Sequence, residues 1–185
     1  MDDGIETYEL LASDALSWLE QARGLRLSAE VMYGALQEVM PLSQTLPGIR
    51  EKKLAYMQSF MLLAAAAFEN LLKGIAVAKN PGGWKTLQED SGHGISEFAS
   101  AVMPLSDAES NLLRRLQEYL VWAGRYTIAK TPTRYASGRQ LRVLRSTDFS
   151  LIWGLFDRLS EVLSANVTKT SNLALQPTRE HFGVR

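Results

Sequence analysis

The chain has 185 residues, a length typical of one domain with its own core, and 46% of them are hydrophobic. Lysine and arginine together number 20, as do aspartate and glutamate, so no net charge draws the chain toward nucleic acid or membranes. Cysteine is absent, which excludes disulfides and thiolate chemistry and favours a reducing compartment. The acidic start lacks the basic and apolar regions of a signal peptide, and the longest apolar run, residues 60–68, is about half of a bilayer span. We therefore expect a cytoplasmic protein without a membrane segment.

Helical periodicity governs the first half of the chain. Apolar residues recur at three- and four-residue steps over residues 5–40, where Gly24 is a candidate break and Pro41 ends the pattern. The strongest prediction is a long helix over residues 49–78. Its middle, residues 60–68, is apolar on nearly every face, and a helix of this kind lies buried at the centre of a fold.

Shorter helices are predicted in the second half. One spans residues 95–102, and another begins at a capping box formed by Ser106 and Glu109 and runs to about Gly124. The stretch after it is irregular, and a last helix begins near Asp148 or the threonine before it.

The chain shows no convincing strand alternation, internal repeat or domain boundary. We therefore predict an all-α fold, a helical bundle of four to five main helices around the long central helix. The bundle forms a single domain over residues 1–168. Residues 169–185 are polar and aperiodic, which predicts a flexible C-terminal tail.

Glu69 and Asn70 interrupt the apolar pattern of the central helix. A buried carboxylate must be paired or hydrogen-bonded. Two interpretations stay open: a structural bond that fixes the register of the helix, and a functional site residue. Glu69 is the only clear inward acid, and the two histidines are far apart in sequence, so we predict neither a metal site nor a cofactor.

His93 lies between two glycines just before a predicted helix, where it could cap the helix, hold a buried carboxylate or transfer protons. Trp122, Arg125 and Tyr126 lie at the end of another predicted helix. Arg125 could bind Glu69 or a phosphate, or it could form an inter-helix ion pair covered by the aromatic side chains.

A charge asymmetry is hidden by the zero total. Between Tyr119 and Thr147 there is no acid, whereas the first fifty residues hold eight acids and three bases. Such a basic and partly aromatic segment suits RNA, but it equally suits an acidic partner protein or the acidic first helix of this chain. Its basic residues are Arg125, Lys130, Arg134, Arg139, Arg142 and Arg145.

The run from Ala67 to Gly74, the Gly92–His93 pair and the segment from Leu116 to Tyr126 together resemble HEPN-type helical proteins of prokaryotes, over roughly residues 55–130. The resemblance implies a helical bundle that is often a homodimer. Many such proteins are ribonucleases of toxin–antitoxin or defence systems, and others are non-catalytic binding modules.

Active HEPN ribonucleases carry an arginine followed, after four to six residues, by a histidine. Neither His93 nor His181 has an arginine at that spacing, and Arg125 is not followed by a histidine. We therefore expect a HEPN-like protein that acts by binding to itself as a homodimer, to a partner protein or to RNA. The alternatives are a divergent metal-independent ribonuclease, with His93, Arg125 and Glu69 converging in one cleft, and a purely structural helical bundle.

Overall fold

The computed structural model describes residues 3–80, 94–123, 131–133, 136 and 144–174. These residues contain helices and no strand, which confirms the predicted all-α bundle. The elements in chain order are α1 (Asp3–Ser13), α2 (Ala15–Val39), α3 (Ile49–Lys79), α5 (Ile95–Val102), α6 (Asp107–Glu118), the π-helical turn η2 (Tyr119–Ala123) and α8 (Asp148–Ala174).

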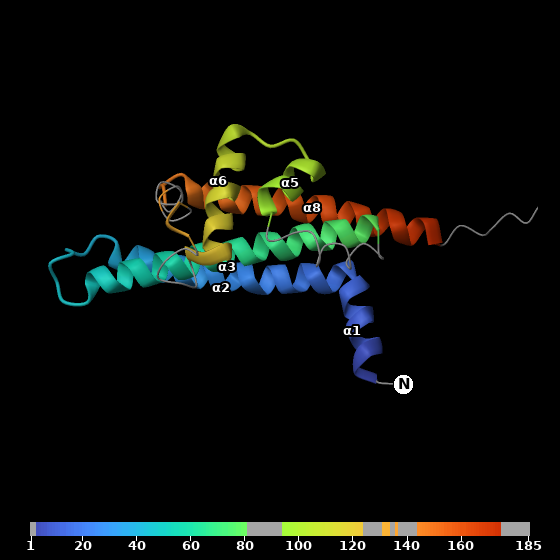
Figure 1. Ribbon diagram of the computed structural model, residues 1–185, viewed down its shortest axis with the longest axis horizontal. Helices are drawn as coiled ribbons and strands as arrows, with labels where there is room; N and C mark the ends of the chain where they lie inside the picture. Colours follow the sequence, from blue (N-terminus) through green and yellow to red (C-terminus); the bar gives the residue numbers. More distant parts are fainter. Residues whose placement is uncertain (1–2, 81–93, 124–130, 134–135, 137–143, 175–185) are drawn as a thin grey trace, which may run out of the picture.

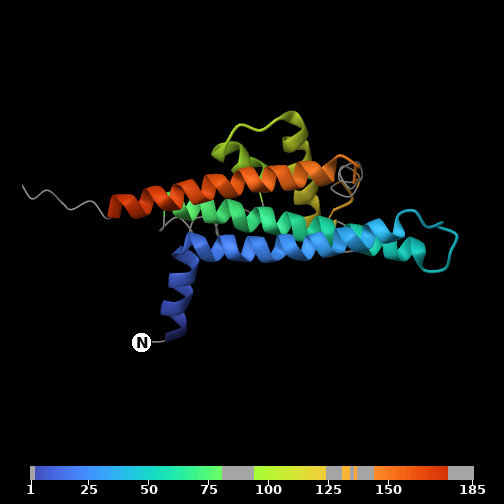
Figure 2. The ribbon, with the colours of Figure 1, turned by 180° about the vertical axis from the view of Figure 1, so that it is seen from behind.

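The three longest helices form the body of the molecule, with α3 lying between α2 and α8 (Figures 1 and 2). Helices α5 and α6 lie on the side of α3 and α8 that is opposite α2, and η2 returns to pack on α3. The predicted central helix is therefore confirmed, with its start at Ile49 as expected and its end one residue later than expected.

Helix α3 is central because it is apolar around most of its circumference. Phe60 and Phe68 are fully buried, and small residues let the neighbouring helices approach closely. Gly74 marks the closest approach: a Cβ atom there would lie 3.0 Å from both Leu163 Cδ2 and Trp18 Cβ. The absence of a side chain at Gly74 thus permits α2 and α8 to meet on α3.

The break in the first helical stretch falls at Asp14 and not at Gly24, which was expected to break or bend the helix. Asp14 has extended backbone angles, and its carboxylate accepts hydrogen bonds from the backbone N–H groups of Leu16 and Ser17. This N-cap starts α2 and separates it from α1. Helix α2 then continues through Gly24 without a break.

The second half follows the sequence pattern closely. Helix α5 has the predicted bounds, and the capping box of α6 is present, with the hydroxyl of Ser106 and the carboxylate of Glu109 each bonded to the other's backbone N–H. Helix α8 starts at Asp148 and continues to Ala174, six residues into the segment predicted as tail. The remainder of that tail, residues 175–185, lies outside the described residues.

Of the helices in the described residues, α3 is the one that is long and apolar enough to cross a membrane by length and composition. In its most apolar window, 61% of the residues are buried inside the protein. The core helix of a soluble protein has the same properties, so the burial of α3 is compatible with a soluble bundle.

Candidate functional site

Most of the side chains proposed from the sequence as site residues lie outside the described residues, so their predicted convergence stays a prediction. For Trp122 the structure describes the backbone, which belongs to η2, and not the side chain. The candidates that lie outside the described ranges altogether are His93, Arg125, Tyr126, Lys130, Arg134, Arg139 and Arg142.

Glu69 and Asn70 are described, and both bond within their own helix. A carboxylate oxygen of Glu69 lies 2.9 Å from Nζ of Lys73, one turn away, and these side chains are 15% and 23% exposed. The side-chain amide of Asn70 donates to the carbonyl oxygen of Ala66 at 2.8 Å. These contacts leave both interpretations of the pair open.

A more deeply buried polar group joins α6 to α8, and the sequence pattern did not reveal it. The guanidinium of Arg115 binds both carboxylate oxygens of Asp148, at 2.5 and 2.6 Å, with side-chain exposures of 3% and 2%. Asp148 also accepts the backbone N–H of Arg145 at 2.6 Å, and Nε of Arg115 donates to Asn111. The bidentate pair therefore fixes both the start of α8 and the segment that precedes it.

A second ion pair at the same junction involves Glu109, the capping residue of α6. Its buried carboxylate accepts hydrogen bonds from the backbone N–H and hydroxyl of Ser106 and from the guanidinium of Arg158 in α8. Burial by itself would raise the pKa of Glu109, but these hydrogen bonds and the charge of Arg158 outweigh it and lower the pKa below its usual value. The capping pattern predicted Glu109 as a cap but gave no sign of its partner on α8.

Large hydrophobic side chains are exposed along α1 and along one face of α2. On α1, Ile5, Tyr8 and Leu11 recur at three-residue steps. We call the exposed hydrophobic residues of these two helices the α1–α2 surface, and its members are Ile5, Tyr8, Leu10, Leu11, Leu16, Leu27 and Val31.

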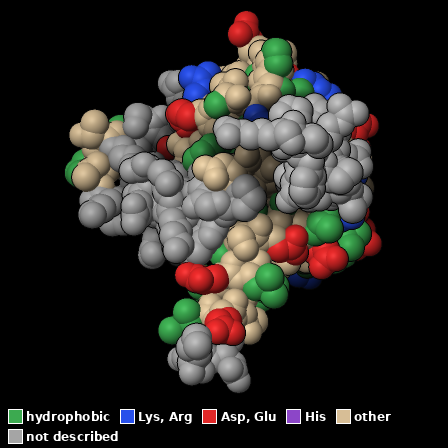
Figure 3. All heavy atoms as spheres, turned by 90° about the vertical axis from the view of Figure 1, so that its right-hand side faces the viewer, with side chains coloured by type: hydrophobic (Ala, Val, Ile, Leu, Met, Phe, Trp, Pro, Cys, Tyr) green, Lys and Arg blue, Asp and Glu red, His purple; other side chains and the backbone are tan. Residues whose placement is uncertain are grey.

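Helix α1 projects away from the bundle (Figures 1 and 2), and four of the seven residues of this surface belong to it. Seen from the end of the molecule where α1 lies, acidic and hydrophobic side chains stand side by side on the projecting part (Figure 3). The sequence of α1 contains three acids and no base. An 11-residue helix is marginally stable in water, so α1 depends on what it packs against.

Apolar side chains lie on both faces of α2. The buried residues of the helix are Ala15, Leu19, Ala22, Ala29, Leu36 and Val39. Leu27 and Val31 lie on the opposite face, with 63% and 65% exposure. Helix α2 therefore has an exposed apolar face besides the one that packs in the core.

Charged residues flank the exposed face of α2. Arg23 is exposed, and Glu30 binds Nε of Arg26 at 3.0 Å while keeping 41% of its side chain exposed. Arg26 itself binds Asp157 of α8 and lies over the rings of Trp153 and Phe156. Arg26 thus belongs to the α2–α8 contact, whereas Arg23 is available to a partner.

Among the histidine, cysteine, aspartate and glutamate side chains of the described ranges, no group of three or more lies close enough together to hold a metal ion.

Comparison with known proteins gives no match: no family model, no curated protein and no solved structure is significantly similar to this chain. The HEPN-like resemblance therefore stays a prediction, and any functional conclusion depends on the surfaces described here.

Proposed function

We propose that this chain is a non-catalytic helical protein that acts by binding, and that its partner is a second copy of itself. The α1–α2 surface carries this proposal. Seven large hydrophobic side chains are exposed on these two consecutive helices, and exposed apolar patches commonly mark interaction sites. The predicted HEPN-like resemblance supports the same conclusion, because homodimers and non-catalytic binding modules occur among such proteins.

A two-fold symmetric dimer would use this surface efficiently. Leu27 is the midpoint of α2, so two α2 helices that pack antiparallel about an axis near Leu27 overlap along their whole length. Each α1 then extends toward the body of the other copy and gains apolar burial that it lacks in one chain.

Charge complementarity supports the same arrangement. Arg23 lies four residues before Leu27 and Glu30 lies three residues after it, on the same side of the exposed face. In the antiparallel pair, Arg23 of each copy therefore lies across from Glu30 of the other copy. Pairs of this kind select the register of helices more than they strengthen the association.

The first test measures the mass of the full chain in solution by light scattering over a range of concentrations. We expect a dimer, and we expect Leu27→Glu to convert it to a folded monomer because it places charges at the centre of the interface. Leu46→Glu is the matched control: Leu46 is also an exposed leucine, but it lies in the turn between α2 and α3. A monomeric wild type, or a dimer that tolerates Leu27→Glu as well as Leu46→Glu, contradicts the proposal.

The second test examines the register. Arg23→Glu and Glu30→Arg should each weaken self-association, because each variant places like charges opposite one another twice. An equimolar mixture should form a heterodimer, since opposite charges then face each other on both sides. If the mixture associates no better than either variant alone, the antiparallel register is wrong even when the wild type is a dimer.

RNA binding is a second candidate, favoured by the absence of acids between Tyr119 and Thr147. Only Arg145 among the six basic residues of this stretch has a described side chain, and it is exposed. Binding of single-stranded RNA should fall steeply with salt if the segment contacts phosphates. Cleavage of that RNA, lost in His93→Ala or Arg125→Ala, would replace both proposals by the divergent ribonuclease.

A further inference from the structure

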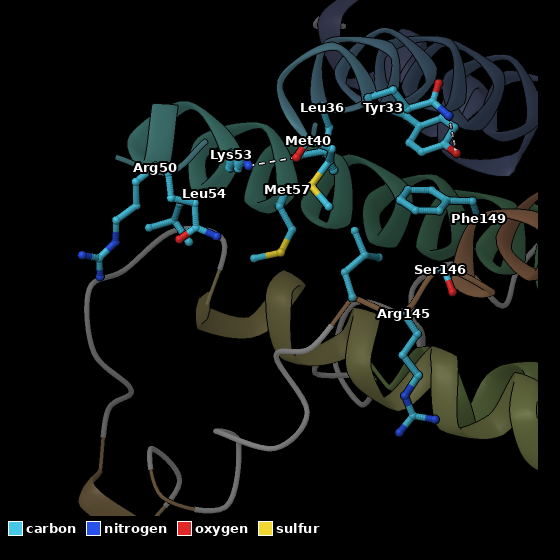
Figure 4. Close-up of a pocket in the computed structure, with 13 residues that line it drawn as sticks. Tyr33, Leu36, Met40, Arg50, Lys53, Leu54, Met57, Arg145, Ser146 and Phe149 are labelled. Carbon is cyan, nitrogen blue, oxygen red and sulfur yellow. Dashed lines mark hydrogen bonds between the residues drawn. The ribbon is translucent and has the colours of Figure 1, made fainter. Parts of the chain in front are cut away.

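A pocket of about 640 Å³ lies between the end of α2, the start of α3 and the segment that leads into α8. Its lining is mainly apolar and includes Leu36, Met40, Leu54, Met57 and Phe149 (Figure 4). Leu36 is buried at the base of the pocket. At the mouth, Met40 is 58% exposed and Leu54 is 50% exposed. The volume falls within the range of small-molecule sites, about 300–1,000 Å³.

Among the described residues that line this pocket, the charged ones are the cations Arg50, Lys53 and Arg145. Nζ of Lys53 donates to the carbonyl oxygens of Met40 and Leu42, at 2.9 and 2.6 Å, which leaves one of its three N–H donors. In the described part of the chain, the guanidinium of Arg50 makes no ion pair. Arg50 and Lys53 lie on the first two turns of α3, where the helix dipole also favours an anion.

The wall opposite α3 is held in place by ring packing, a side-chain hydrogen bond and a buried ion pair. The rings of Tyr33 and Phe149 lie 3.8 Å apart, and the phenolic oxygen of Tyr33 accepts a hydrogen bond from Gln37 at 2.7 Å. Asp148, bound to Arg115, anchors the backbone of Arg145 next to the pocket. The cavity is therefore bounded by fixed elements on three sides. Because these elements are already ordered, a ligand loses less conformational entropy of the protein when it binds.

We propose that this pocket binds a small amphipathic carboxylate, with a hydrocarbon body and one anionic head group. The carboxylate binds Arg50 and the remaining donor of Lys53, and the hydrocarbon lies against Met40, Met57 and Leu54. Figure 4 shows the two methionine side chains between Arg50 and Arg145, with the Arg145 head group directed away from them. Methionine side chains adapt to hydrocarbon ligands of differing shape.

Calorimetric titration of the full chain with dodecanoate, kept below its micelle concentration, tests this proposal. We expect saturable binding of one molecule per chain. Dodecyltrimethylammonium, which has the same chain length and the opposite charge, should bind at least about tenfold more weakly, because the charged residues in the described lining of the pocket are cations. Equal affinity for both ions, or no saturable binding of dodecanoate, overturns the proposal.

Two variants locate the site, and each has a matched control. Arg50→Glu should weaken dodecanoate binding by at least about tenfold, while Arg114→Glu, at an exposed arginine of α6, should leave it unchanged. Met57→Trp should fill the cavity and abolish binding, while Leu42→Trp, beside the pocket but outside its lining, should not. Circular dichroism establishes that each variant is folded. Binding that survives both pocket variants contradicts the assignment.

Two further measurements distinguish binding in the pocket from binding elsewhere. Anionic phospholipid vesicles that bind the chain when monomeric dodecanoate does not would identify a membrane surface as the ligand, and the proposal would fail. The Leu27→Glu variant should bind dodecanoate with wild-type affinity, because Leu27 does not line the pocket. Loss of binding in this variant would show that the ligand requires the α1–α2 surface and not the pocket.

Discussion

Two ion pairs of this protein have opposite environments. Arg115 and Asp148 join α6 to α8 across 33 residues of sequence and are almost completely buried. Glu69 and Lys73 lie one turn apart on α3 and stay partly exposed. A pair within one helix contributes little to the fold because its helix forms without it, whereas a buried pair between helices must be satisfied for the two helices to meet. We therefore expect the contact between Glu69 and Lys73 to contribute less to stability than the contact between Arg115 and Asp148.

The largest effect is expected at the buried pair. Asp148→Asn should lower the free energy of unfolding by about 3–5 kcal/mol, because it removes the negative charge that binds the buried guanidinium of Arg115. Urea unfolding monitored by circular dichroism measures the change. The double variant Arg115→Met/Asp148→Leu should recover much of the loss, since it removes both charges. A double variant as unstable as Asp148→Asn would show that the hydrogen bonds, and not the unpaired charge, dominate.

The next largest effect is expected at the end of α3 near Lys73, where stability should depend on packing and not on charge. Gly74→Ala should destabilise the protein by about 1–3 kcal/mol, because the new methyl group meets Leu163 and Trp18. Gly154→Ala is the control on α8, where the space is open, and it should stabilise by about 0.5–1 kcal/mol. Melting temperatures that shift in the same direction for both would exclude the close approach at Gly74.

A smaller and pH-dependent effect is expected at the second pair of the junction. The pKa of Glu109 is lowered in the folded protein, so its contribution to stability is present at pH values above its unfolded pKa, about 4.3. That contribution is lost as the pH falls through the folded value. Glu109→Gln should lower the free energy of unfolding by about 1–2 kcal/mol at pH 7. It should also make that free energy less dependent on pH below about 5. If the free energies of unfolding of the wild type and of Glu109→Gln change with pH in parallel, the lowered pKa of Glu109 is refuted.

The smallest effect completes the comparison. Lys73→Gln should change the free energy of unfolding by about 0.5 kcal/mol, the value of a pair within one helix. Its binding of a second copy should be unaffected, because Lys73 lies outside the α1–α2 surface. A loss comparable to that of Asp148→Asn would reverse the ranking of the two pairs.

Local patterns in the sequence predict the helices well. The apolar run of α3, the capping box at Ser106 and the start of α8 all depend on residues close together in the chain, and all are confirmed. The sequence does not predict the break at Asp14. An aspartate within a helical apolar pattern is normally interpreted as a solvent-facing residue, and only its extended backbone angles identify it as an N-cap.

The polar core could not be predicted in the same way. Asp148 was recognised as the start of a helix, but nothing near it in sequence identifies Arg115 as its partner. The pocket has the same character, because Arg50 and Phe149 come together only through the packing of α2, α3 and the segment before α8. Sequence periodicity identifies the buried face of each helix, but it does not identify which faces pack against one another.

The short connection between α2 and α3 has a consequence for the order of folding. These helices pack along most of their length, and only residues 40–48 separate them, so their contact closes a short loop at little entropic cost. Helix α8 must reach α3 from the far end of the chain. We expect the α2–α3 hairpin to form the folding nucleus, with high φ-values for Ala22→Gly and Ala65→Gly and low ones for Leu159→Ala in α8. The reverse ranking in stopped-flow refolding would place the nucleus elsewhere.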